Sequence, residues 1–242
     1  HHGNFSNGVN CTGNGKSGTG CIFDGVDDRI AISDHSDLDI TSEITLMAWI
    51  KLLPTGPSNT PEIINKPHTS FGGPYFMYNL DVPGTKQIRM NIAIGGVRKE
   101  CQHGVNAISH DTWTHLAATY DGSNQRVYIN GILKKTCAET GAIDTNDMPL
   151  YIGGITTTNV AYLNGSIDEA SVWNRALNGT AILQIYEADK SKFELIVANT
   201  TGFDSDAVVY SHLGINNFSE NRDFSPSSAE DDEYTLFVEH FE

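Results

Sequence analysis

Residues 112–137 read TWTHLAATYDGSNQRVYINGILKKTC, and this stretch decides the fold class. Its apolar and β-branched runs predict strands, and the Asp121-Gly122 pair predicts the turn between the first two. Asn130-Gly131 then supplies the positive φ angles that a tight hairpin turn requires. The strands are predicted over 113–120, 125–129 and 132–135. Successive antiparallel strands joined by short turns predict a β-sandwich.

The rest of the chain fits this class. An apolar face with a period of two predicts a strand formed by Ile44, Leu46, Ala48, Ile50 and Leu52. One short helix is expected over 180–187, behind a capping residue at Asn178. The predicted organisation is an N-terminal segment over 1–17, an all-β sandwich of two antiparallel sheets over 18–190, and a strand-rich C-terminal extension over 191–242.

Size and charge exclude several classes of partner. The chain has 242 residues, a length that one large β-sandwich can reach. Its 15 basic and 30 acidic residues give a net charge of −15, which would repel nucleic acid and anionic membranes. The sequence contains no apolar run long enough for membrane insertion. This charge is compatible with binding of calcium.

The cysteines and the glycosylation sequons indicate a secreted or cell-surface protein. The four cysteines fall into two groups, and pairing within each group predicts the disulfides Cys11–Cys21 and Cys101–Cys137. Two other pairings, and four reduced thiols, remain as alternatives. Asn-x-Ser/Thr sequons predict N-glycosylation at Asn4, Asn10, Asn164, Asn178, Asn199 and Asn217.

Three motifs in order along the chain carry a resemblance to a known family. They are Phe23-Asp24-Gly25-Val26-Asp27-Asp28, the central hairpin region over 113–131, and the closing segment over 163–177. The sequence resembles the laminin-G-like (concanavalin A-like) jelly-roll family. This resemblance implies two antiparallel sheets, often with calcium near one rim, and members that bind glycans, proteins or other ligands.

The resemblance also implies a place for a calcium site. It puts the ion where the turn over 24–28 meets the closing strand, with Asp24, Asp27 and Asp168 as the expected ligands. The alternative is that the residues of the turn only shape the backbone and that Asp168 accepts hydrogen bonds from backbone amides.

Catalytic patterns are missing from the sequence. Glucanases with this sandwich topology place carboxylates at alternate positions of one strand, in the pattern Glu-x-Asp-x-Glu. The comparable stretch here is Ser166-Ile167-Asp168-Glu169-Ala170, in which both alternating Glu positions are lost. We therefore expect a protein that is not an enzyme.

The C-terminal extension carries much of the negative charge. Residues 191–242 contain 11 acidic and 2 basic residues, which gives −9. The last predicted strand, over 234–241, has apolar groups on both faces, at Tyr234, Leu236, Phe237, Val238 and Phe241. We expect this strand to dock into a sheet of another copy and build a head-to-tail filament. The alternative is that it folds back on its own sandwich.

These observations lead to a functional expectation with one alternative. The first reading is a structural or adhesive extracellular subunit whose partners are other copies of itself, and the alternative is a carbohydrate-binding module of a larger secreted enzyme or adhesin. Calcium is the expected inorganic partner, and a glycan is the expected small ligand.

Overall fold

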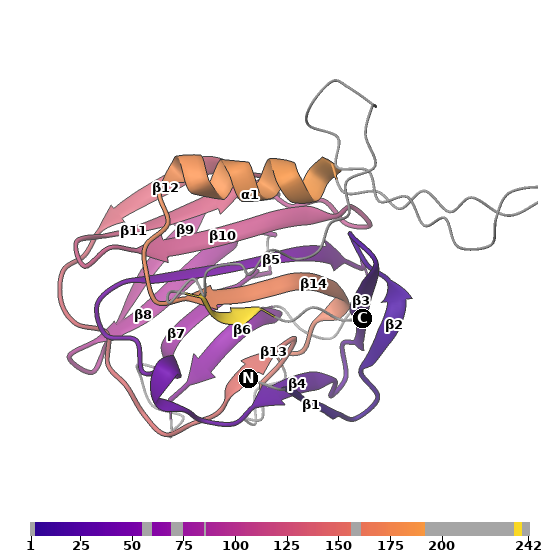
Figure 1. The fold of residues 1–242 in the computed structure, drawn as a ribbon, viewed down its shortest axis with the longest axis horizontal. Coiled ribbons are helices and arrows are strands. Elements are labelled where there is room, and N and C mark those ends of the chain that lie inside the picture. Colours follow the sequence, from indigo (N-terminus) through magenta and orange to yellow (C-terminus); the bar gives the residue numbers. More distant parts are fainter. Residues whose placement is uncertain are drawn as a thin grey trace, which may run out of the picture.

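The computed structural model describes residues 3–54, 60–68, 75–84, 86–155 and 161–191, together with the backbone of Thr235–Val238. Over these residues the chain forms two antiparallel sheets packed face to face, with one α-helix on the outer face of one sheet (Figure 1). The predicted two-sheet all-β sandwich is therefore confirmed.

The sheets contain seven and eight strands. In spatial order, the seven-stranded sheet consists of β1 (Gly3–Ser6), β4 (Arg29–Ile32), β13 (Leu150–Ile152), β6 (Glu62–Pro67), β7 (Phe76–Asp81), β8 (Ile88–Ile94) and β9 (Val97–His103). The eight-stranded sheet runs β12 (Ile132–Ala138), β11 (Asn124–Ile129), β10 (Thr114–Tyr120), β5 (Ile44–Leu52), β14 (Asn164–Trp173), β3 (Thr19–Asp24) and β2 (Asn10–Asn14), with β15 (Thr235–Val238) also paired to β14.

The N-terminal residues belong to these sheets. Strand β1 pairs with β4 at one edge of the seven-stranded sheet, and β2 pairs with β3 at one edge of the eight-stranded sheet. The segment predicted over 1–17 thus contributes an edge strand to each sheet.

The core lies between the sheets and follows the predicted alternation. Leu46, Ala48 and Ile50 of β5 are fully buried in the same apolar cluster as Met90 and Ile92 of β8. Each fully buried large aliphatic side chain contributes about 1.5–3 kcal/mol to the free energy of unfolding. This shared interior is what holds the two sheets together.

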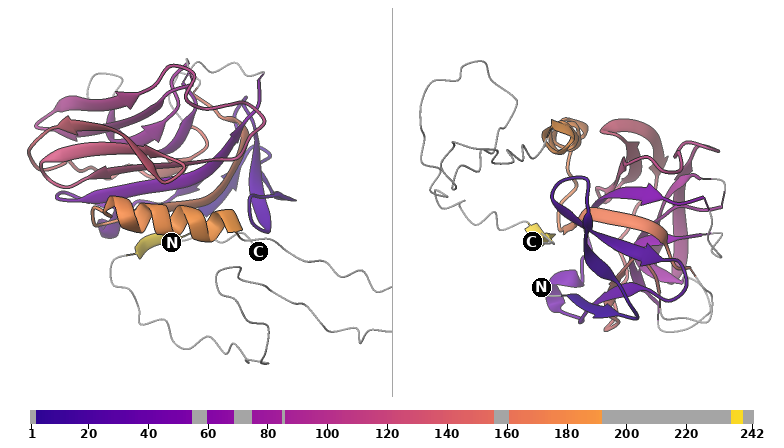
Figure 2. Two further views of the ribbon diagram at one scale, coloured as in Figure 1. Left: turned by 90° about the horizontal axis from the view of Figure 1, so that it is seen from above. Right: turned by 90° about the vertical axis from the view of Figure 1, so that its right-hand side faces the viewer.

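The opposite face of β5 is also buried. Met47 and Trp49 lie beneath helix α1 (Gly179–Ser191), where a second apolar cluster includes Ile182. Figure 2 shows α1 as an extra layer outside the sandwich. The side-chain oxygen of Asn178 accepts a hydrogen bond from the Ala181 amide and so caps the start of the helix.

Trp49 anchors the C-terminal half of α1. Its ring stacks on Tyr186 with centroids 5.5 Å apart, and its indole N–H donates to Asp189 at 3.3 Å. The ammonium group of Lys16 lies 4.7 Å from the centre of the Trp49 ring and donates to the Asp189 carbonyl. These contacts explain why the helix runs to Ser191 instead of ending near residue 187 as predicted.

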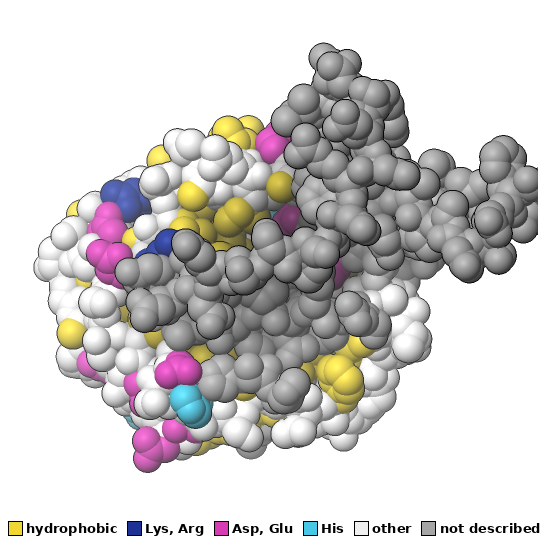
Figure 3. Space-filling view, in the orientation of Figure 1, with side chains coloured by type: hydrophobic (Ala, Val, Ile, Leu, Met, Phe, Trp, Pro, Cys, Tyr) yellow, Lys and Arg dark blue, Asp and Glu magenta, His cyan; other side chains and the backbone are white. Residues whose placement is uncertain are grey.

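Apolar side chains gather on the surface around this helix (Figure 3). Ile132 and Leu133 at the start of β12 are 58% and 48% exposed, and Leu183 of α1 is 42% exposed. A Cβ on Gly131 would come within 2.8 Å of Leu183, so the turn before β12 fits closely against the helix.

The predicted Asn130-Gly131 turn is confirmed. Asn130 and Gly131 have φ angles of 51° and 75°, as a tight hairpin turn between antiparallel strands requires. The Asn130 side chain accepts a hydrogen bond from the His115 amide, and the Asn130 amide donates to the His115 carbonyl. The turn is therefore tied to β10 as well as to its own strands.

His115 should make the fold sensitive to acid. Burial lowers the pKa of His115 from 6.5 to about 4, and the charge of Asp189 only partly opposes this. Between pH 6.5 and about 4 the unfolded chain binds a proton that the folded chain excludes, so stability falls as the pH drops. We expect a loss on the order of 3 kcal/mol across this window.

Thermal unfolding from pH 7.5 to 4.5 tests this expectation. His115→Phe, which cannot titrate, should flatten the dependence of Tm on pH, whereas His35→Phe at an exposed histidine should keep it. An unchanged slope in His115→Phe would show that another group causes the acid sensitivity.

Candidate functional site

Both predicted disulfides are present. Cys11–Cys21 links the adjacent strands β2 and β3. Cys101–Cys137 links β9 to β12, which are the end strands of different sheets. The second bond therefore closes one side of the sandwich covalently.

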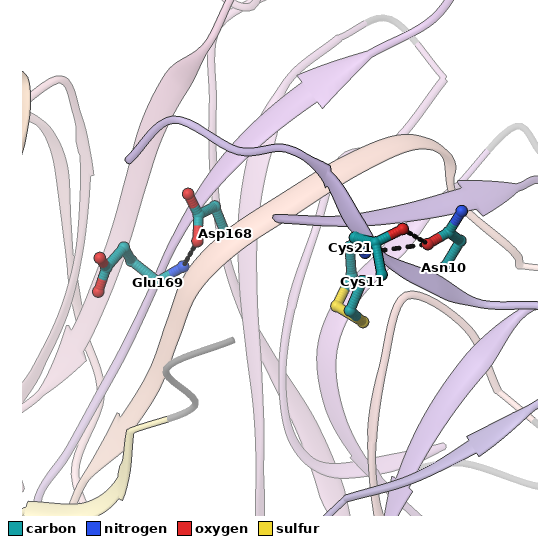
Figure 4. The surroundings of a disulfide bond; sticks show 6 residues. Asn10, Cys11, Cys21, Asp168 and Glu169 are labelled. Atoms are coloured by element: carbon teal, nitrogen blue, oxygen red, sulfur yellow. Dashed lines mark hydrogen bonds between the residues drawn. A yellow bond between two sulfur atoms is a disulfide. The ribbon is translucent and has the colours of Figure 1, made fainter. Parts of the chain in front are cut away.

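Asp168 lies in β14 and is held by backbone amides, of which Figure 4 shows that of Glu169. One carboxylate oxygen accepts hydrogen bonds from the amides of Lys16 and Ser17 at 2.7 and 3.0 Å, and the other accepts from the Glu169 amide at 2.8 Å. Burial raises the pKa of Asp168, and these amide hydrogen bonds oppose that rise. The carboxylate fixes the loop between β2 and β3.

The expected participation of Asp168 in a calcium site is therefore wrong. The register of β14 against β3 puts Asn164 opposite Asp24, so Asp168 lies four residues farther along the strand. Four residues of β-strand span about 13 Å, which is too far for a shared ion. The sequence resemblance correctly indicated that β14 lies beside β3 and its turn, but it could not predict which residues of the two strands are paired.

The turn between β3 and β4 nevertheless gathers three carboxylates. Asp24, Asp27 and Asp28, which we call the acidic turn, place one oxygen each within 4.8 Å of one another. Two of the three expected ligands are thus brought together, and Asp28 stands where Asp168 was expected. No ion pair to these three carboxylates occurs within the described ranges of the chain.

The backbone of the acidic turn is organised by its own side chains. One oxygen of Asp24 accepts from the amides of Val26 and Asp27, and one oxygen of Asp28 accepts from the Asp24 amide. Gly25 has a φ of 79°, and a Cβ there would lie 2.7 Å from the Cβ of Asn164. A glycine is therefore required both by conformation and by the close approach of β14.

Asp28 is the unusual member of the acidic turn. Its side chain is buried, with 3% of the residue exposed, and its second oxygen has no hydrogen-bond partner among the described residues. Burial raises the pKa of Asp28, and the charges of Asp24 and Asp27 raise it further. A hard cation would be a partner for this oxygen and would also offset the repulsion between the three carboxylates. The residues present therefore fit the calcium that the resemblance implies.

Calcium should therefore stabilise the protein through the acidic turn. At a free concentration of about 100 times Kd, a bound ion should raise Tm by about 5–10 °C relative to chelator, because it binds only the folded state. Asp28→Asn preserves the shape of the side chain and should abolish this shift, whereas Asp147→Asn, at an exposed acid elsewhere, should not. Equal melting temperatures with calcium and with chelator would contradict the site.

The predicted glycosylation sites differ in their surroundings. Asn4, Asn10 and Asn178 are exposed, whereas Asn164 is half-buried beside Gly25. Asn199 and Asn217 lie outside the described residues. Attachment of glycans stays a prediction, and the crowding at Asn164 makes it the least suitable of the four described positions.

The predicted assembly strand pairs with its own chain. Of that segment the structure describes the backbone of β15, which runs antiparallel to Ser171–Trp173 of β14 (Figure 1). Strand β3 pairs with β14 only from Asn164 to Ile167, so the remaining length of that edge is free for β15. Tyr234 and Phe241 lie outside the described residues. The arrangement in the structure corresponds to the alternative in which the extension folds back.

A polar ladder on the outer face of the seven-stranded sheet was not anticipated. The Asn79 side chain donates to Glu62 and accepts from Asn91, which links β6, β7 and β8. Asp81 and Arg89 form a salt bridge on the same face. Burial raises the pKa of Glu62 well above its usual range, and the charge of Asp81 adds to the rise. Polar residues alternating with apolar ones in 78–81 and 89–92 were the available sequence signal.

Comparison with known proteins identifies the fold and then the family. The fold resembles the binding domain of Paraclostridial Mosquitocidal Protein 1, with a TM-score of 0.62, 14% identity, and coverage of 80% of this chain and 49% of that one. It also resembles the botulinum neurotoxin mosaic serotype C/D receptor-binding domain, with a TM-score of 0.61, 16% identity and coverage of 77% and 45%. A third similar structure is the botulinum neurotoxin serotype D ligand-binding domain in complex with N-acetylneuraminic acid. Its TM-score is 0.59 and its identity 15%, and the match covers 77% of this chain and 45% of that one. The chain spans about half the length of these domains.

The family follows from the sequence match. The profile of the concanavalin A-like lectin/glucanases superfamily matches residues 24–183, which is more than half of the chain. The chain therefore belongs to this superfamily, as the resemblance implied. No curated protein matches it. Within the part that the structure describes, no helix is both long and apolar enough to cross a membrane.

Proposed function

We propose that this protein is a non-catalytic, extracellular adhesive domain that binds a glycan at the rim formed by the acidic turn. The observation that carries the proposal is the meeting of Asp24, Asp27 and Asp28 within 4.8 Å, with Asp24 exposed and Asp27 at least partly exposed. A calcium ion held there would keep coordination positions that saccharide hydroxyls can fill, because calcium takes six to eight oxygen ligands. The family includes lectins, and one structural neighbour carries a bound sialic acid, which supports a glycan as the ligand.

Two further observations support the non-catalytic and extracellular parts of the proposal. The alternating carboxylates of glucanases are missing, and all the hydrogen bonds of the remaining Asp168 go to backbone amides. The two disulfides suit an oxidising compartment.

A glycan array tests the ligand. The labelled full chain should retain sialylated or neutral glycans in calcium, and binding should weaken by about tenfold or more with chelator or in Asp27→Asn. Asp147→Asn, which makes the same charge change elsewhere, should bind as the wild type does. Failure to retain any glycan in calcium would contradict the ligand class, and hydrolysis of a retained glycan would contradict the non-catalytic assignment.

Self-association is a second candidate function, and the pairing of β15 with the edge of β14 favours it, because the same edge of another copy offers the same backbone partners. Residues 192–234 give 43 residues between the end of α1 and β15. A connection of this length places little restriction on which copy of β14 receives the strand. Exchange of β15 between copies would build the head-to-tail assembly through backbone pairing.

A proline substitution separates the two arrangements of the extension. Phe237→Pro removes an amide from the centre of β15 and should abolish any concentration-dependent assembly measured by light scattering, without lowering the Tm of the sandwich. Glu230→Pro, placed before the strand, is the matched control and should still assemble. A full chain that stays monomeric at every concentration, or a Phe237→Pro variant that unfolds, would show that β15 serves its own sandwich.

A further inference from the structure

Lys66 is a fully buried lysine at the end of β6. Its side chain has no exposed surface, and Tyr78, which is also buried, lies opposite it in β7. The ammonium nitrogen lies 2.5 Å from a carboxylate oxygen of Asp34 and donates to the Met148 carbonyl at 2.9 Å. A lysine with no exposed surface is uncommon and requires a partner that offsets the loss of hydration.

A second carboxylate lies beside this pair. An oxygen of Asp39 is 3.8 Å from the Lys66 nitrogen, is itself buried, and has no hydrogen-bond partner within the part of the chain that the structure describes. Asp39 directly follows the short 3₁₀ helix Ser36–Leu38, and the hydroxyl of Tyr78 donates to the Leu38 carbonyl. The fold therefore holds one amine and two carboxyl groups together from segments distant in sequence.

We propose that Lys66 and Asp34 condense to form an intramolecular isopeptide bond, with Asp39 as the proton carrier. Groups fixed in contact react as if at effective concentrations of about 10⁵ M or more, which removes the entropic barrier to amide formation. The product replaces a buried ammonium and its carboxylate by one neutral amide, so the cost of burying two charges disappears. Burial of the nitrogen also limits the water that would reverse the reaction.

The step balances without any other reactant. Lys66 loses a proton to Asp39, and its nitrogen lone pair attacks the Asp34 carboxyl carbon. The bond between that carbon and one carboxylate oxygen then breaks, and the oxygen leaves as water with two protons from the original ammonium, one returned by Asp39. The amide nitrogen keeps its remaining proton, which can still be donated to the Met148 carbonyl. One ammonium and one carboxylate thus give one amide and one water.

Mass spectrometry of the full chain tests the proposal directly. With both disulfides reduced and with no glycans attached by the host, the wild type should be lighter than its sequence by the mass of one water molecule. Digestion should yield a branched peptide joining Asp34 to Lys66. A full sequence mass, with both residues recovered in separate unmodified peptides, would overturn the proposal and leave an ion pair.

Variants test the role of each residue by mass and not by stability alone. Lys66→Arg keeps the charge but cannot condense and should show its full mass, whereas Asp34→Asn should lose ammonia in place of water. Asp39→Asn should leave most of the chain unlinked, and Asp37→Asn, two residues earlier in the chain, should stay fully linked. If Lys66→Arg does not fold, the change from water loss to ammonia loss in Asp34→Asn still decides the matter. Full linkage in Asp39→Asn would overturn its role as proton carrier.

Discussion

The pairing of β14 with its neighbours is the constraint on which the rest of the structure depends. This strand lies between β5 and β3, and its register against β3 puts Asn164 opposite Asp24 and close to Gly25. The same strand places Asp168 under the loop between β2 and β3, and leaves an edge free for β15. Because a shift by one residue moves every side chain to the other face, all these features depend on one register.

Buried polar groups then fix the segments that strand pairing does not reach. Asp168 holds a loop through amide hydrogen bonds, Trp49 and Asp189 hold the end of α1, and Lys66 holds the turn around Asp34. Each of these groups costs free energy to bury unless a partner is present, so each one selects a single arrangement of its neighbours. Loops in this protein are therefore positioned by charge and hydrogen bonding, and sheets by apolar packing.

The fold separates the surfaces on which function would depend. The acidic turn follows the end of β3 and joins it to β4, whereas β15 pairs with Ser171–Trp173 of β14, beyond the start of β3. Cys101–Cys137 joins the end strands of the two sheets at neither of these places. A ligand at the turn and a strand at the edge could thus act without competing for the same residues. Membership of a superfamily with many ligands does not choose between them.

The sequence by itself determined the sandwich and the Asn130-Gly131 turn, because alternation and turn chemistry are local patterns. Cysteine grouping predicted both disulfides but left other pairings open, and the structure chose between them. The sequence indicated the acidic turn but assigned Asp168 to it, since register depends on contacts between distant strands. It also ended the helix too early, because the contacts of Trp49 with Tyr186 and Asp189 that hold the last turns join residues far apart in the sequence. The second buried face of β5, the polar ladder and the meeting of Lys66 with two carboxylates were decided only by tertiary structure, because each joins side chains that lie far apart along the chain.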